Sequence, residues 1–263
     1  MTHTSSHTSW TGLAWHVFRY QNVIFFRNLL SAFFALAFPL MFLLIFGGIF
    51  GSQIDPTTGV PVIQTMVPSM LVFAVVSSTY INLAIVVPIA RDEGILKRVR
   101  GTPMPPSAFM VGRIASAVWV ALISAAIQLV VAVFLYDFEI IWRTVPAAMV
   151  GVVLGIACFS ALGLAVASII PNGDSAPMIA NFTALPILFL SGIFLPLDAA
   201  PAWVRAIGEV FPIRHMYLAL AETTVPPEVS LGFAWTHLGV VALWTAAGVI
   251  AAVRFFRWDD NRD

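Results

Sequence analysis

The sequence predicts an all-α membrane protein of a single domain, residues 1–263, with six transmembrane helices. Of its residues, 60% are hydrophobic and 10% are charged, whereas soluble domains are about 25% charged. Charge-free stretches long enough to cross a bilayer, which takes about 20 residues, occur six times. Lipid offers no partners to backbone polar groups, so each stretch should be helical, and such long apolar runs disfavour a β-barrel. The expected spans are about 29–51, 68–90, 112–135, 145–170, 177–195 and 231–254.

Residues 9–28 precede the first span and predict an amphipathic helix lying on the inner membrane surface. Gln21 interrupts its apolar stripe, and Arg19 and Arg27 lie on the other side. A solvated, slightly basic start to the first span is the alternative. The stripe itself consists of Trp10, Leu13, Val17, Tyr20 and Ile24.

Polar side chains mark the second span, which is expected to begin near Pro68 because proline is favoured at a first helical position. Such side chains usually make hydrogen bonds between membrane helices. They could also line a water-filled path, and the sequence leaves both interpretations open. The polar patch consists of Ser77, Ser78, Thr79, Tyr80 and Asn82.

Residues 91–103 form a charged elbow between the second and third spans. Its first ten residues hold six of the 26 charged side chains, and a central arginine or lysine costs a membrane helix about 3 kcal/mol, so the elbow must lie outside the lipid. A short helix is expected, with Glu93 and Lys97 spaced for an ion pair, ending at Gly101-Thr102-Pro103. Because so short a helix is unstable alone in water, it should dock on another surface. Its narrow apolar stripe is Ile95, Leu96 and Val99.

Basic residues predict that both termini lie on the cytoplasmic side. With six spans and an inner N-terminus, ten of the thirteen basic residues fall inside, as the positive-inside rule requires. Arg143, Arg205 and Arg214 fall outside. The zero net charge of the chain therefore conceals opposite signs on its two faces.

An unusual segment, residues 192–228, follows the fifth span on the outer side. It is apolar but interrupted by prolines, and Ala202–Val210 has helical spacing. Irregular backbone at membrane depth is tolerated only where protein or water covers its polar groups. A short broken or re-entrant helix at the outer membrane face is therefore expected. The residues that mark it are Gly192, Pro196, Pro201, Trp203 and Pro212.

The elbow resembles a motif of a known family. The run Arg91-Asp92-Glu93-Gly94-Ile95-Leu96, followed by Arg98, Thr102 and Pro103, is similar to the R-E-x-G-T-L-x-R-x-x-x-T-P segment of type-2 ABC transporter permeases, the drug, lipid and polysaccharide exporter group. The resemblance covers nearly the whole chain. There are two departures: Ile95 replaces a small hydroxyl residue, and Ala221-Glu222 stands where many relatives have an arginine.

The resemblance implies a multi-pass transport subunit of the cytoplasmic, or inner, membrane that is not itself an enzyme. It also implies a second permease chain, identical or related, packed face to face with this one. In the family the elbow is a coupling helix that docks on a separate ATP-binding subunit, with the apolar stripe as a contact surface. The corresponding residues are Arg91, Asp92, Glu93, Gly94, Ile95, Leu96, Lys97, Arg98 and Arg100.

The family's substrate path runs along the second and fifth spans. Its aromatic and neutral polar lining suits an amphipathic drug-like molecule or lipid, exported by alternating access. On this chain the path maps to Tyr80, Asn82, Asn181, Phe182 and Phe189.

The chain is expected to carry no motor. Lys97 is the only lysine and lies in no GxxxxGK[ST] loop, so the phosphate-binding loop of an ATPase is missing. ATP and Mg²⁺ are then expected on the partner subunit, with no cofactor or metal bound by this chain. Membrane lipid is an expected partner and nucleic acid is not. Cys158 is the only cysteine, which excludes an intrachain disulfide.

Two other classes remain open. An ion-coupled transporter or channel usually buries ionisable residues within its spans, and none lies centrally here, although backbone carbonyls can also coordinate ions. Asp174, in the PNGDS turn, is more simply a solvated loop charge. An intramembrane hydrolase needs a nucleophile near a base. Ser191 lacks the GxSG pattern of such proteases, and His215 and His237 fall near the outer surface.

Overall fold

The computed structural model describes residues 9–56, 58–102, 104–194, 197, 200–225 and 230–255, and Pro103 and Pro196 lie outside them. The described chain is helical, with π-helical turns at η1 and η2 and a 3₁₀ turn at η3. Its elements are α1 (Trp10–Arg27), α2 (Leu29–Ala32), η1 (Phe33–Ala37), α3 (Phe38–Phe50), α4 (Ile63–Val76), η2 (Ser77–Ile81), α5 (Asn82–Asp92), α6 (Ile95–Arg100), α7 (Pro106–Tyr136), η3 (Trp142–Thr144), α8 (Val145–Ile169), α9 (Ala176–Leu190), α10 (Ala202–Val210), α11 (Pro212–Thr224) and α12 (Trp235–Phe255).

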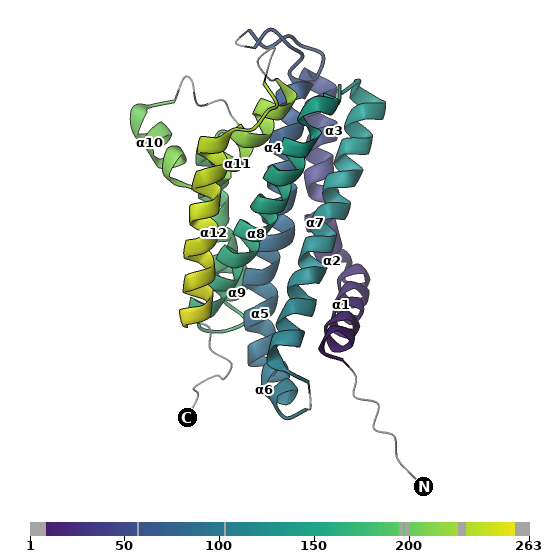
Figure 1. The fold of residues 1–263 in the computed structure, drawn as a ribbon, viewed down its shortest axis with the longest axis vertical. Helices are drawn as coiled ribbons and strands as arrows, with labels where there is room; N and C mark the ends of the chain where they lie inside the picture. The colour runs from purple at the N-terminus through teal and green to yellow at the C-terminus, as the bar shows by residue number, and fades with distance from the viewer. Residues whose placement is uncertain are drawn as a thin grey trace.

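The long helices form an elongated bundle (Figure 1). The shorter α9 is apolar but has 15 residues, or about 22 Å, against a hydrocarbon core of roughly 30 Å. The fifth charge-free stretch is divided because Gly192 takes a left-handed φ of 86° just after α9. The described residues therefore contain five helical stretches of membrane-spanning length where six were predicted: Phe33–Phe50, Ile63–Asp92, Ser107–Tyr136, Trp142–Ile169 and Trp235–Phe255.

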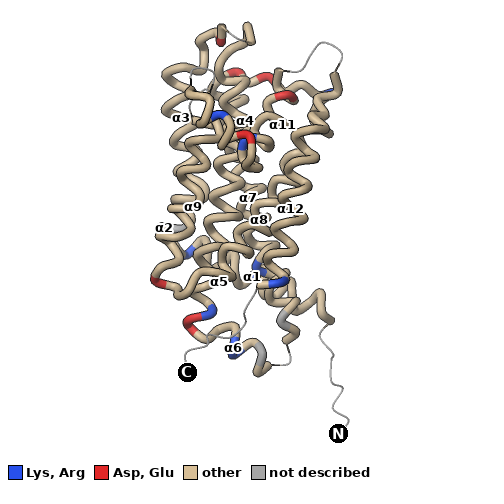
Figure 2. The backbone as a smooth tube through the Cα atoms, turned by 90° about the vertical axis from the view of Figure 1, so that its left-hand side faces the viewer, with Lys and Arg blue, Asp and Glu red and all other residues tan. Residues whose placement is uncertain are grey.

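Charged residues gather at the two ends of the bundle. Figure 2 shows acidic and basic positions at both ends and none across the middle. The short helix α6 lies at the same end as the start of α1 and the end of α12 (Figure 1). The elbow and the two ends of the described chain therefore share one side, which we call the inner end.

The second span begins before Pro68, so the predicted start was wrong. α4 starts at Ile63, and Pro68 lies inside the helix. Proline is tolerated within membrane helices where neighbouring groups support the backbone. Here Ile63 and Val67 are buried against Leu43 and Phe138, and this packing extends the helix toward the end opposite α6.

The two π-helical turns pack against each other. In η1 the carbonyl oxygen of Ala35 accepts hydrogen bonds from the hydroxyl groups of Ser124 (3.1 Å) and Ser78 (3.5 Å). Thr79 is fully buried and donates to the carbonyl of Val75 at 2.6 Å. Ser78 of the polar patch therefore joins the second span to the first, as the first of the two interpretations predicted, and Ser124 of the third span bonds to the same carbonyl.

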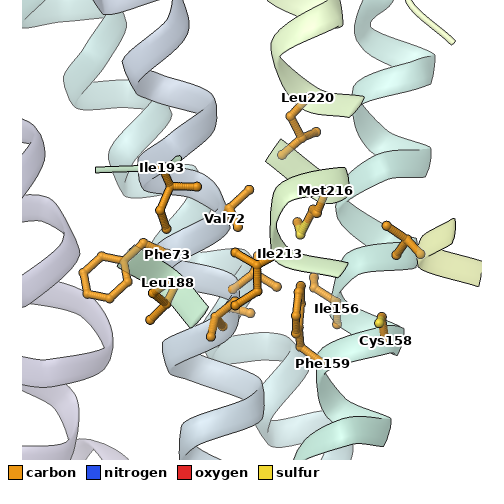
Figure 3. Close-up of a cluster of buried hydrophobic side chains, with 14 of the residues drawn as sticks. Val72, Phe73, Ile156, Cys158, Phe159, Leu188, Ile193, Ile213, Met216 and Leu220 are labelled. Carbon is orange, nitrogen blue, oxygen red and sulfur yellow. The ribbon is translucent and has the colours of Figure 1, made fainter. Parts of the chain in front are cut away.

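The main apolar core lies between α4, α8, α9 and α11, with α11 beside α12 and α4 at the end opposite α6 (Figure 1). Gly155 of α8 allows α11 to approach, because a Cβ atom there would collide with the Met216 side chain. Small residues at such crossings let membrane helices pack closely. Figure 3 shows this core, which includes Val72, Phe73, Ile156, Cys158, Phe159, Leu188, Ile193, Ile213, Met216 and Leu220.

The first helix packs on the bundle through only part of its predicted apolar stripe. Val17 is buried, whereas Tyr20 and Ile24 are 59% and 43% exposed and open to the surroundings of the chain. Beside lipid, exposed positions are as apolar as buried ones, and an apolar stripe does not mark the side that faces protein. α1 packs along α7 at Gly112, where a Cβ atom would lie 2.6 Å from the Ala14 carbonyl oxygen. The buried residues of α1 are Val17, Gln21 and Phe25.

Candidate functional site

Gly94 divides the elbow into the end of α5 and the short helix α6. Its φ of 68° is left-handed, a conformation that glycine adopts at no steric cost. Glu93 therefore caps α5 while Lys97 lies on α6, and no ion pair joins these two described residues. The predicted pair was wrong because the turn at Gly94 places its members on different helices. Arg98 instead donates from Nη2 to the carbonyl oxygen of Glu93 at 2.8 Å, which fixes α6 across the turn.

The apolar side of α6 packs on the chain itself. Leu96 is fully buried against Val17 of α1 and Phe109 of α7, with Ile95 and Val99 at the margin. The expectation that this stripe is a contact surface for a separate subunit was therefore wrong for Leu96. A short helix needs apolar contacts for stability, and the nearest ones are intramolecular. α6 is thus anchored on α1 and α7 through Leu96.

The exposed face of the elbow is polar. The side chains of Glu93, Lys97 and Arg98 are exposed, and Figure 2 shows acidic and basic positions close together at this tip. We call these three residues the elbow face. It presents both signs of charge on a helix whose position is fixed by Leu96, so it can dock a complementary charged surface in a defined orientation.

Arg91 and Asp92 hold the loop between α8 and α9 against the end of α5. Arg91 is buried and donates from Nη2 to the carbonyl oxygens of Ile170 (2.5 Å) and Pro171 (3.3 Å). Asp92 Oδ2 accepts a hydrogen bond from the backbone N–H of Gly173, and its Oδ1 lies 4.0 Å from Arg91 Nε. We call these contacts the inner clamp, because they join parts of the chain 79 residues apart.

The sequence did not predict that the loop between α8 and α9 contacts the elbow. The PNGDS run was visible as a turn, and Asn172 Oδ1 does accept from the Ser175 backbone N–H at 2.8 Å. Gly173, however, also sits against α5: a Cβ atom there would lie 3.0 Å from Ile89 Cα. Glycine at position 173 therefore allows the turn to pack closely against α5 beside the elbow.

Arg113 lies inside α7 and not in the loop before the third span. α7 begins at Pro106, earlier than predicted. Arg113 is 6% exposed, and its Nη1 donates to the carbonyl oxygen of Val86 at 2.9 Å. Its guanidinium carbon lies 5.2 Å from the Phe109 ring centroid. The predicted boundary was wrong because these partners accommodate the charge within the helix.

The predicted path residues on the second span separate onto two faces. The Tyr80 hydroxyl donates to Thr183 Oγ1 at 2.8 Å, which joins η2 to α9. Asn82 instead lines a small cavity with Gln21 and Arg113, beside α1 and α7. Tyr80 and Asn82 thus lie on different faces, because residues two apart on a helix do not face the same way.

The predicted path residues on α9 lie on the surface of the chain. Asn181 donates from Nδ2 to the Pro177 carbonyl within its own helix, at 2.8 Å. Phe182 and Phe189 are 78% and 56% exposed. α9 therefore presents an aromatic, largely apolar face outward from the chain.

A row of phenylalanines that sequence reasoning missed continues from this face. The centroids of Phe189 and Phe194 are 5.0 Å apart, and Phe194 in turn lies 5.2 Å from Phe73 and 5.6 Å from Phe42. The sequence signal that could have revealed this row is the spacing of four residues between Phe34, Phe38 and Phe42 along the first span. The phenylalanine row consists of Phe34, Phe38, Phe42, Phe73, Phe189 and Phe194.

The outer segment is built from two helices, α10 and α11. Gly192 ends α9 in a left-handed conformation, and a Cβ atom there would lie 3.0 Å from Arg214 Nη1. Pro201 precedes α10, which forms where the spacing predicted a helix. Pro212 is the buried first residue of α11. Trp203 is 63% exposed, so it faces the surroundings of the chain.

Hydrogen bonds hold the outer helices on the bundle. Trp244 Nε1 donates to the Val210 carbonyl at 2.9 Å, and Thr144 Oγ1 donates to the Thr223 carbonyl at 2.6 Å. These bonds connect the outer segment to α12 and to the start of α8.

The residues considered for a hydrolase have other partners. The Ser191 hydroxyl donates to the Leu188 carbonyl at 2.7 Å, and His215 Nδ1 lies 2.9 Å from His237 Nδ1. Within the described ranges, no three His, Cys, Asp or Glu side chains are placed to hold a metal ion. These contacts fix α11 on α12 and give no nucleophile paired with a base.

Comparison with known proteins decides the family. A family model described as ABC-2 type transporter matches residues 13–224, well over half of the chain. The chain belongs to the ABC-2 type transporter family. The resemblance indicated by the elbow motif, to type-2 ABC transporter permeases, is thereby confirmed.

Two relatives of this ABC-2 permease carry informative names. The inner membrane transport permease YadH of Escherichia coli K12 is 24% identical over 213 residues, which cover 80% of this chain and 77% of the relative. The probable multidrug ABC transporter permease YbhR of the same strain is 23% identical over 192 residues, covering 73% of this chain and 52% of the relative. With its apolar helices, this chain is a multi-pass inner membrane permease. The family implies an ATP-binding ABC partner.

Proposed function

We propose that this chain is the transmembrane subunit of an ABC exporter, moving an amphipathic drug-like molecule or lipid outward by alternating access. The observation that carries the proposal is α6, which is anchored through Leu96 on α1 and α7 and leaves the elbow face exposed. A separate subunit binds ATP and Mg²⁺ and docks on this face. This chain then supplies the path and no ATPase site.

Packing supports transmission from the elbow to the spans. Close-packed protein interiors transmit displacement with little compression. Movement of α6 reaches α1 and α7 through Leu96, and it reaches the α8–α9 loop through the inner clamp. A displacement of α6 is thus transmitted to α1 and α7 and also to the loop between α8 and α9. Alternating access requires such a coupled movement of the spans.

We place six spans in the membrane, with both termini and the elbow inside. α9 is the fifth span although it is short, and the outer segment 192–228 re-enters the membrane beyond it. Two observations support this arrangement. α11 packs against α4, α8 and α12 at the end opposite α6, and α9 ends just before Gly192, which has a left-handed φ.

Substitution in the elbow face is expected to separate ATP hydrolysis from export. Glu93→Ala and Lys97→Glu leave Leu96 in place, so the stability should change by less than about 0.5 kcal/mol. Export should fall by about tenfold, which corresponds to 1.4 kcal/mol of lost coupling. The measurement is ATP hydrolysis and substrate export by the co-purified complex in liposomes, with Arg19→Glu on the exposed side of α1 as the matched control. Unchanged export in both elbow variants would remove the coupling role.

We place the substrate path along α9, facing a second permease chain. The exposed Phe182 and Phe189 and the phenylalanine row support this placement, since apolar and aromatic walls with few polar groups bind amphipathic molecules. Tyr80 of η2 and Asn181 of α9 add neutral polar groups to this proposed path.

Phe189→Ala is expected to lower export of aromatic substrates by about three- to tenfold, since an aromatic contact contributes about 0.5 to 1.5 kcal/mol. Phe134→Ala on α7 is the matched control, because Phe134 is 81% exposed and lies outside the phenylalanine row. The measurement is export of a panel of amphipathic dyes by inverted vesicles, normalised to the amount of inserted chain. Equal effects of the two variants would reject a path along α9.

A further inference from the structure

A small cavity with polar residues in its lining lies between α1, α5 and α7. α1 itself lies toward the inner end of the bundle (Figure 1). The volume of the cavity is about 50 Å³, several times the roughly 10 to 15 Å³ needed for one water molecule. Four polar side chains line it, among apolar neighbours such as Ile24 and Phe25. The polar side chains are Gln21, Asn82, Arg113 and Ser116.

Arg113 brings to this cavity a positive charge that the Val86 carbonyl and the Phe109 ring contact but that no described acidic side chain pairs with. Its side chain is 6% exposed, and Nε has no hydrogen-bond partner. Of the five N–H donors on a guanidinium, one is used by the Val86 carbonyl. The acidic residue whose charge acts on it is Glu93 on the elbow, and no ion pair joins these two described residues. A buried charge without a counter-ion is unfavourable, so the site favours an anion.

The other polar side chains have hydrogen-bonding capacity to spare. Gln21 and Ser116 are buried, at 9% and 6% exposure, and Asn82 is half-buried. None of the three makes a side-chain hydrogen bond to another residue within the described part of the chain. Each can donate an N–H or O–H into the cavity. Gln21, which breaks the apolar stripe of α1, thus lines the same cavity as Arg113.

We propose that this cavity binds a phosphate group, supplied by a phospholipid of the inner leaflet. A guanidinium with amide and hydroxyl donors around it matches the oxygens of a phosphate. The lipid source is favoured because Ile24, at the edge of the cavity, is 43% exposed on a helix that also exposes Tyr20 and Val23. An acyl chain could lie along this apolar surface while the headgroup enters between α1 and α7. The lipid would then hold α1 in place beside the elbow.

The test uses the purified full chain in detergent and measures its thermal unfolding midpoint. The midpoint is followed against added dioleoyl phosphatidylglycerol, dioleoylglycerol and inorganic phosphate. Phosphatidylglycerol should raise it, and dioleoylglycerol, which has the same acyl chains without phosphate, should not. In Arg113→Gln the half-saturating concentration of phosphatidylglycerol should rise by about tenfold. Arg19→Gln, which removes an exposed arginine from α1, should respond like the wild type.

A second variant protects the test against loss of folding in Arg113→Gln. Gln21→Leu keeps the arginine but replaces a polar lining side chain with an apolar one of similar size, and it should show the same loss of response. If inorganic phosphate alone gives the Arg113-dependent shift, the phosphate site stands and its source is the free ion. The proposal is overturned if phosphatidylglycerol and dioleoylglycerol act equally, or if either cavity variant keeps the wild-type response.

Discussion

Arg91→Leu is expected to destabilise the chain by about 3 kcal/mol and to abolish export by the assembled complex. The substitution leaves the carbonyl oxygens of Ile170 and Pro171 without their donor, and it removes the positive charge beside Asp92. Because Arg91 is buried, water cannot fully replace these contacts. The α8–α9 loop should then separate from the end of α5. Denaturant unfolding in detergent and export from liposomes measure the two effects.

Two further variants make this result specific. Arg91→Lys keeps the charge but loses the planar fork that reaches two carbonyls, so it should give an intermediate loss. Arg19→Leu removes an exposed arginine and should shift stability by less than about 0.5 kcal/mol. A wild-type unfolding midpoint together with wild-type export in Arg91→Leu would show that the inner clamp has no role.

Gly163→Ala is expected to destabilise the bundle by about 2 to 3 kcal/mol. A Cβ atom at Gly163 of α8 would lie 2.7 Å from the Tyr80 carbonyl oxygen and 2.9 Å from Tyr80 Cα. Backbone atoms cannot turn aside as a flexible side chain can, so α8 must move away from η2 and α5. The Tyr80–Thr183 hydrogen bond lies beside this contact, and export should fall with stability. Thermal unfolding of the purified chain measures the change.

Gly239→Ala is the matched control, because a Cβ atom there meets nothing within 4 Å. Replacing an unhindered helical glycine by alanine should stabilise the chain by up to about 1 kcal/mol. The two glycine variants are therefore expected to have opposite signs. The close contact at Gly163 would be disproved if both variants were equally stable.

Charge and hydropathy predicted the bounds of α8 well and the end of α9 poorly. The stretch predicted at 145–170 became α8, Val145–Ile169, because nothing within it interrupts a helix. The stretch at 177–195 became the shorter α9, because the left-handed Gly192 stops it. Hydropathy carries no information about such backbone conformations. It also cannot separate residues that face lipid from residues that face protein, as the exposed Tyr20 shows.

The sequence predicted where the elbow lies in the chain, but it did not predict which other segments the elbow contacts. The elbow was visible from its charges, yet the docking of Leu96 on Val17 joins segments far apart in the chain. The separation of Tyr80 from Asn82 has a local cause, because residues two apart on a helix do not face the same way. Helical spacing alone therefore separates these two side chains.

The docking of an ATP-binding subunit on the elbow face is the central claim, and single-cysteine cross-linking tests it most directly. Cys158 is the only native cysteine and is fully buried, so an introduced thiol is selectively reactive. In the assembled, ATP-hydrolysing complex, Lys97→Cys should form a short cross-link to the ATP-binding subunit, and Phe134→Cys on the exposed side of α7 should not. Absence of a cross-link from Lys97→Cys in that complex, or an equal yield from both positions, would contradict it.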